Sequence, residues 1–266
     1  MRMDFITAET AEAGAVEETA AIEKQWTRAW QAAGGPQGLA DHIPGKEEYR
    51  AIASYLARLP KGARLLDGGC GLGDWTLHFT RAGYPTLGLD ISRATVELLQ
   101  RKFPEAEFTV GDIRATGLPD ACVDGYFSWG TFEHFQDGLG GCVREAFRIL
   151  KPGGWLFVSV PFDNLRHSLR AILLDAHRRA PQTQSQRFYQ WRLTRGELAD
   201  ALAGGGFVVE DVVIIGKRQG MQRLLQHNLG LQPTGLPAKA AAVLLSPLIP
   251  AVAVGHMILA IARRPA

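Results

Sequence analysis

The chain has 266 residues, 46% of them hydrophobic, so it can bury one large core, and we expect a single domain over residues 1–266. Its 29 basic and 27 acidic side chains nearly balance, which gives no basis for a protein that binds nucleic acid through its overall charge. The three cysteines form no C-x-x-C pair and the acidic N-terminus lacks an apolar signal segment. These features argue against a cysteine zinc site and favour the cytoplasm.

Residues 1–60 are expected to form an N-terminal helical cap. The small and polar residues of 1–16 show no clear period, so we expect this segment to be partly disordered. An apolar stripe that recurs every fourth residue predicts a helix over 16–33, and a second helix is expected over 46–59, before a proline. Three aromatic side chains of this cap either pack in the core or cover a ligand pocket: Trp26, Trp30 and Tyr49.

The stretch 63–76, ARLLDGGCGLGDWT, is the one around which the chain is organised. An apolar run ends at Asp67, and four glycines follow before a helical pattern begins at Asp74. This order predicts a buried strand, a tight turn and a helix start whose free N–H groups can meet polar or anionic ligand atoms. The dinucleotide fingerprint needs glycine where Asp74 stands, and a Walker-type loop needs a lysine that the turn lacks.

Strands and helices alternate at short spacing after this turn. Further strands are expected over 86–89, 107–110, 123–128 and 155–160, and helices over 74–82, 93–102 and 136–150. Ser92 should cap the helix that begins at residue 93. Asp90 stands at the end of the second strand, where a carboxylate can accept hydrogen bonds from two adjacent ribose hydroxyls. The alternation predicts a doubly wound, mostly parallel α/β sheet with helices on both faces.

Taken in chain order, these motifs resemble the class I S-adenosylmethionine-dependent methyltransferases. The resemblance covers residues 63–160 and rests on the glycine turn, Asp90, Gly111-Asp112-Ile113, the segment that begins at Trp129, and the turn RILKPGG. It implies the family's seven-stranded sheet and S-adenosylmethionine as cofactor. It also implies that Asp112 accepts from the adenine amine while Ile113 lies against the ring. The residues that it assigns to the cofactor are Asp67, Gly68, Gly69, Gly71, Gly73, Trp75, Asp90, Ile91, Asp112, Ile113, Trp129 and Gly130.

The resemblance further implies transfer of a methyl group from a sulfonium to a nucleophile, and the candidate bases are Glu133, His134 and Tyr189. His134 has an ordinary pKa near neutrality, but a Glu-His pair at a helix start is also common packing in this family. Related quinone O-methyltransferases carry Glu-x-x-Glu-His for a metal ion. Because this chain has Gly130 at the first of these positions, we expect no metal site.

Residues 161–193 form an insertion after the fifth strand. Its first part reads as an amphipathic helix with arginines on the polar side, and its end carries Phe188, Tyr189 and Trp191. In this family such an insertion commonly builds the acceptor pocket. Aromatic walls with a few arginines suit a small, partly apolar acceptor better than a nucleic acid or a protein, which need an open groove.

The C-terminal half, residues 194–266, begins with a helix that Thr194 caps and a sixth strand over 207–215. Residues 240–262 are long enough to span a membrane, but prolines interrupt them, and HMILAIARRP resembles the family's last, antiparallel strand. We therefore expect a helix, a break at 246–250 and a buried strand over 256–262. Membrane contact through this segment is the less favoured alternative.

The function expected is methyl transfer to a small, partly apolar metabolite at an O-, N- or C-nucleophile, with residues 61–160 as the cofactor-binding half. Two alternatives remain open. One is a non-catalytic binding protein with the same fold, and the other is a membrane-associated methyltransferase with a lipid-like acceptor. A nucleotide-dependent oxidoreductase is disfavoured by the failed fingerprint. The acceptor, the attacked atom and the oligomeric state do not follow from the sequence.

Overall fold

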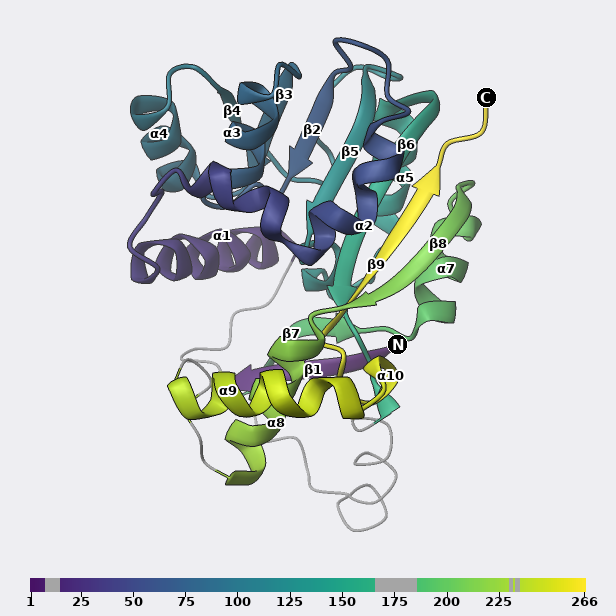
Figure 1. Ribbon diagram of the computed structural model, residues 1–266. Coiled ribbons are helices and arrows are strands. Elements are labelled where there is room, and N and C mark those ends of the chain that lie inside the picture. Colours follow the sequence, from purple (N-terminus) through teal and green to yellow (C-terminus); the bar gives the residue numbers. More distant parts are fainter. Residues whose placement is uncertain (8–14, 166–185, 230–231, 233–234) are drawn as a thin grey trace.

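A seven-stranded sheet forms the centre of the protein in a computed structural model that describes residues 1–7, 15–165, 186–229, 232 and 235–266 (Figure 1). Its strand order is β4-β3-β2-β5-β6-β9-β8, with β2 to β6 parallel and β9 antiparallel to both β6 and β8. The strands are β2 (Leu65–Gly68), β3 (Thr86–Asp90), β4 (Glu107–Val110), β5 (Val123–Trp129), β6 (Leu150–Pro161), β8 (Val208–Ile215) and β9 (Met257–Arg263). The order reverses between β2 and β5, which opens a crevice at their carboxyl ends. The predicted sheet is confirmed.

Helices cover both faces of this sheet. The helices of the described residues are α1 (Ala15–Ala32), α2 (Glu47–Leu56), α3 (Asp74–Arg81), α4 (Arg93–Lys102), α5 (Gly140–Ile149), α7 (Arg195–Gly204), α8 (Lys217–Leu229), α9 (Leu236–Leu245) and α10 (Ala251–Val254), with the 3-10 turns η1 (Leu39–Gly45), η2 (Phe132–His134) and η3 (Ser246–Leu248). Of these, α8, α9 and α10 lie beyond the sheet. One buried cluster joins Leu66 and Tyr126 of the sheet to α5 and α7. A second cluster joins Leu65 and Phe127 to α2 and α3. Neighbouring residues of one strand thus enter opposite layers, and for this reason the strands read as continuous apolar runs.

Local signals at the helix ends are largely confirmed. The Ser92 hydroxyl accepts from the Thr95 N–H at the start of α4, and Thr194 forms a capping box with Glu197 at the start of α7. The prediction that a helix begins at residue 136 is wrong. Residues 132–134 form the turn η2, Gly138 takes a left-handed φ of 87°, and α5 begins only at Gly140.

The N-terminal segment corrects a second prediction. Residues 2–7, expected to be partly disordered, form the strand β1 (Arg2–Thr7), which pairs antiparallel with β7 (Gln186–Arg192) at the end of the insertion. The Asp4 carboxylate accepts from Arg192 Nε at 2.6 Å and from the Gln190 side-chain amide at 3.1 Å. Residues 166–185, which carry most of the predicted amphipathic helix, lie outside the described residues.

The C-terminal segment follows the prediction closely. Residues 236–254 form α9, η3 and α10, and β9 then enters the sheet interior between β6 and β8. Figure 1 shows α8, α9, α10 and the β1–β7 pair gathered at one end of the molecule, beyond the sheet. Within the described residues, every helix is too short or too polar to cross a membrane.

Candidate functional site

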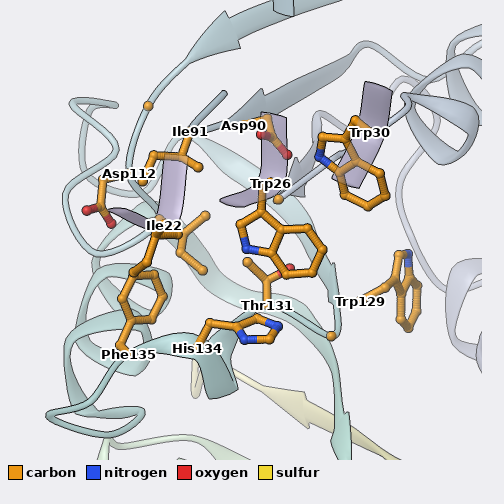
Figure 2. Close-up of a pocket in the computed structure, with 14 residues that line it drawn as sticks. Ile22, Trp26, Trp30, Asp90, Ile91, Asp112, Trp129, Thr131, His134 and Phe135 are labelled. Carbon is orange, nitrogen blue, oxygen red and sulfur yellow. The ribbon is translucent and has the colours of Figure 1, made fainter. Parts of the chain in front are cut away.

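A cavity of about 140 Å³ lies where the carboxyl ends of β2, β3, β4 and β5 converge, and Ile22, Trp26 and Trp30 of α1 contribute to its wall (Figure 2). Its lining residues are Ile22, Trp26, Trp30, Gly69, Asp90, Ile91, Gly111, Asp112, Ile113, Trp129, Gly130, Thr131, His134 and Phe135. Seven of the twelve residues assigned to the cofactor are therefore brought together. They are Gly69, Asp90, Ile91, Asp112, Ile113, Trp129 and Gly130.

Asp90 is held at the centre of the polar side of the cavity. One carboxylate oxygen accepts from the Gly71 N–H and the other from the Ser92 N–H, each at 2.9 Å. These bonds fix the plane of the carboxylate, and the backbone of Ile91 also contributes a hydrogen bond to it. Burial raises the pKa of Asp90, since the charged form loses its hydration.

Asp67 and Trp75 do not line the cavity, so their assignment to the cofactor stays a prediction. The buried Asp67 carboxylate accepts from both the backbone N–H of Thr76, at 3.1 Å, and its hydroxyl, at 2.7 Å, so it anchors the first turn of α3. Desolvation raises the pKa of Asp67 to about 7. The Trp75 ring packs among the aromatic side chains of the core and lies 4.6 Å from the ring of Trp129.

Three of the assigned glycines also serve packing. A Cβ at Gly68 would lie 2.4 Å from the Tyr126 ring, and one at Gly73 would lie 2.7 Å from Leu99. At Gly71, where φ is 52°, a Cβ would lie 2.8 Å from the indole of Trp30. The glycine turn is thus bare because core side chains and α1 approach it closely, as well as because it borders the cavity.

Asp112 shares its carboxylate with Arg114, a residue that the sequence analysis did not select. The guanidinium lies 2.8 Å from Asp112 and 3.1 Å from Glu18 of α1, so it ties α1 to the edge of the cavity. The hydrogen bonds from Arg114 raise the pKa of its own guanidinium further above the ordinary value. They also occupy part of the accepting capacity that was expected to face an adenine amine.

Helix α1 supplies two of the three aromatic residues that the sequence left undecided. The rings of Trp26 and Trp30 stack at 5.2 Å, and Trp26 meets the His134 ring edge-on at 5.0 Å (Figure 2). Both tryptophans line the cavity. Tyr49 does not. It packs against His78, with ring centroids 5.2 Å apart, on the α2–α3 side.

Among the three candidate bases, only His134 lines the cavity. Its Nδ1 lies 2.8 Å from the carbonyl oxygen of Tyr189. Since a carbonyl can only accept, Nδ1 carries the proton of the neutral ring and donates it, which leaves Nε2, 3.9 Å from Glu133 Oε1, as the unprotonated nitrogen. Desolvation lowers the pKa of His134, so the neutral ring dominates at pH 7.

Glu133 and Tyr189 lie next to His134 but do not line the cavity. Glu133 is buried, its Oε2 has no hydrogen-bond partner among the described residues, and desolvation raises its pKa to about 8. It is therefore protonated at neutral pH. The Tyr189 ring lies 5.2 Å from that of His134, and the Trp191 indole donates to the carbonyl of Phe135 at 2.9 Å. The aromatic end of the insertion thus supports the lining residues His134 and Phe135, whereas it was expected to line the pocket itself.

Four lining residues were not selected from the sequence: Ile22, Gly111, Thr131 and Phe135. Each lies next to a residue or within a pattern from which a helix or a site residue was predicted. Ile22 belongs to the apolar stripe of the first helix, and Gly111 precedes Asp112 in the third-strand motif. Thr131 and Phe135 flank Glu133 and His134, in the loop after β5.

Comparison with known proteins finds methyltransferases both by sequence and by structure. Residues 66–158 match a family model described as a methyltransferase domain. A probable S-adenosylmethionine-dependent methyltransferase of Mycolicibacterium smegmatis is 29% identical over 187 residues, which are 70% of this chain and 68% of that protein. A malonyl-[acyl-carrier protein] O-methyltransferase of Enterobacter lignolyticus is 30% identical, over 62% of this chain and 64% of that protein.

Among solved structures, the chain is similar in fold to the 1,6-didemethyltoxoflavin-N1-methyltransferase of Burkholderia thailandensis, which was crystallised with 1,6-didemethyltoxoflavin and S-adenosylhomocysteine. The TM-score is 0.60 and the identity 17%, over 98% of this chain and 95% of that one. At 17% identity, this similarity shows that the two proteins share a fold.

Proposed function

We propose that the chain is a class I S-adenosylmethionine-dependent methyltransferase, which transfers the methyl group of this cofactor to a small, partly apolar metabolite. The match of residues 66–158 to a methyltransferase domain and the similarity to the methyltransferase of Mycolicibacterium smegmatis support this. The observation that carries the proposal is the composition of one cavity. It joins the carboxylates of Asp90 and Asp112 to an apolar wall that contains Trp26, Trp129 and His134. A polar end for a nucleoside and an apolar end for an acceptor are what such a reaction requires.

The residues present fit the cofactor. The Asp90 carboxylate lines the cavity with its plane fixed by backbone N–H groups, which suits a ribose diol, and the apolar side chains of Ile91 and Ile113 suit the faces of an adenine ring. When bound, S-adenosylmethionine supplies an electrophilic methyl group on a positively charged sulfur. Aromatic walls such as those of Trp26 and Trp129 favour a cation, because the ring face is electronegative.

His134 is the group that we propose takes a proton from the acceptor. Its Nδ1 is committed to the Tyr189 carbonyl, so Nε2 is the atom that accepts. Burial keeps the ring neutral at pH 7 and therefore ready to accept. Trp26 and Trp30 of α1 form part of the cavity wall, where they would keep water away from the cofactor's sulfonium and from the nucleophile and so favour alignment of the two reactants.

The proposal is tested by binding and then by transfer. Calorimetric titration should give a micromolar dissociation constant for S-adenosylhomocysteine, and radiolabelled cofactor incubated with a fractionated metabolite extract should label a small molecule. Asp200→Ala, an exposed carboxylate on α7, is the matched control for Asp90→Ala. Absence of binding by the parent chain, or equal binding by the Asp90→Ala variant, would contradict the assignment of the cavity.

A further inference from the structure

Helix α9 is built with its large side chains outward. Ala238 and Ala242, four residues apart, are fully buried, so small residues make the inner face of the helix, which packs on α8. Leu236 and Leu244 point away, with 83% and 73% of their surfaces exposed. A surface helix that only completed the core would place its leucines inside and polar residues outside. In α9 the small residues face inward and the leucines face outward, which is the reverse of that pattern.

The exposed apolar surface continues beyond α9. Leu248 of η3 is 78% exposed, and Val252 of α10 is also exposed. Together with Leu236, Val243 and Leu244, these residues form what we call the α9 face. Protruding aliphatic side chains over three consecutive elements exceed the scattered exposure that a soluble surface normally shows, so the face needs an occupant.

The charged side chains of α8 and α9 themselves are all basic. Asp211 is the last acidic residue of the chain, and it is followed by Lys217, Arg218 and Arg223 of α8 and Lys239 of α9, whereas Arg263 and Arg264 lie at the far end of β9. Lys239 is exposed on α9 itself, and Arg218 is exposed on the helix beneath it. Neither side chain forms a salt bridge within the part of the chain that the structure describes. A negatively charged occupant is therefore favoured.

We propose that the α9 face docks the protein on the surface of an anionic lipid bilayer. Leu244 and Leu248 would enter the acyl boundary while Lys239 meets the headgroups, as in helices that lie in the membrane interface. The face is a helix surface with protruding leucines, which a fluid bilayer can accommodate without a preformed groove. With ten residues, α9 is far too short to span the membrane, so the contact is peripheral. This proposal does not depend on the proposed function.

The test is cosedimentation of the full chain with vesicles of phosphatidylcholine, alone or mixed equally with phosphatidylglycerol. We expect binding that is at least tenfold tighter to the anionic vesicles and that weakens with salt. Leu244→Glu together with Leu248→Glu should lower it at least tenfold, and Lys239→Glu should lower it only on anionic vesicles. Leu98→Glu, at a leucine 39% exposed on α4, is the matched control and should bind like the parent.

Thermal unfolding and affinity for S-adenosylhomocysteine should be unchanged in these variants, which excludes misfolding as the cause of lost vesicle binding. If the double glutamate variant did not fold, Leu244→Gln alone would serve in its place. Failure of the parent chain to sediment with either vesicle would overturn the proposal. So would self-association that Leu244→Glu abolishes, since a second copy would then cover the face. Binding to an acidic carrier protein without binding to vesicles would overturn it as well.

Discussion

Replacing Asp67 by asparagine should make the stability of the protein less dependent on pH. The buried carboxylate accepts two hydrogen bonds from Thr76, yet desolvation dominates and raises its pKa from 3.8 to about 7. The folded state therefore holds a proton that the unfolded chain has already released. For a group of this kind, stability is fully present below the unfolded pKa and is lost as pH rises through the folded pKa.

The size of the effect follows from the two pKa values. Each pKa unit corresponds to about 1.4 kcal/mol, and between about pH 5 and pH 7.5 the difference integrates to roughly 2.5 kcal/mol of stability lost through Asp67. Asparagine is neutral at both pH values and still offers the Thr76 groups an oxygen acceptor. The asparagine variant should lack this loss. Its free energy of unfolding should exceed that of the parent by more at pH 7.5 than at pH 5.

Urea unfolding of both proteins at the two pH values measures this double difference, in which titrations common to both chains cancel. Asp200→Asn, at an exposed site on α7, controls for the removal of one negative charge. Two results would refute the reasoning. One is that the stabilities of the parent and the Asp67→Asn variant change equally with pH, and the other is that the Asp67→Asn variant becomes less stable relative to the parent at pH 7.5. Either would mean that Asp67 is already ionised in the folded state.

Three further predictions concern the cavity and the sheet. Asp90→Ala should weaken the binding of S-adenosylhomocysteine at least tenfold, or by about 1.4 kcal/mol, as measured by calorimetric titration. The ribose loses a paired acceptor, and two backbone N–H groups lose theirs. His134→Gln should lower kcat by about a hundredfold with cofactor affinity unchanged. In the parent, kcat should decrease with falling pH only below pH 6.5, because burial lowers the pKa of His134. This decrease should be absent in the His134→Gln variant. If it persisted, His134 would not be the base. Deletion of residues 255–266 should give insoluble protein, because β9 pairs with both β6 and β8, and a soluble truncated chain would contradict that role.

The cofactor-binding half could be predicted from the sequence because its signals are local. Ser92 precedes a helix and caps it, Asp90 ends a strand and faces the crevice, and Gly111-Asp112-Ile113 follows the next strand. In a parallel sheet, the carboxyl ends of adjacent strands meet at one edge, so residues placed by strand order alone converge in space. The last strand, β9, was expected from a different source, the resemblance of HMILAIARRP to the family's last antiparallel strand, and it forms over Met257–Arg263.

The sequence did not indicate contacts whose partner is distant in the chain, or contacts that depend on which way a side chain points. The partner of β1 lies about 180 residues away, and the acid–base pair of Asp4 with Arg192 leaves no local trace in the sequence. Asp67 and Asp90 both end strands and look equivalent. Asp67 instead turns toward the first turn of α3, where Thr76 binds it, and only Asp90 faces the cavity.

The position of α1 shows why packing and ligand binding could not be separated from the sequence. Trp30 contributes to the cavity wall, and its indole also lies so close to Gly71 that a side chain there would collide with it. Arg114 bonds both Asp112 and Glu18, so the edge of the cavity and the helix above it share one guanidinium. The N–H of Gly71 binds Asp90 in turn. A substitution at Gly71 would therefore disturb α1 and the carboxylate at once, and lost cofactor binding in such a variant would not by itself identify Gly71 as a ligand contact.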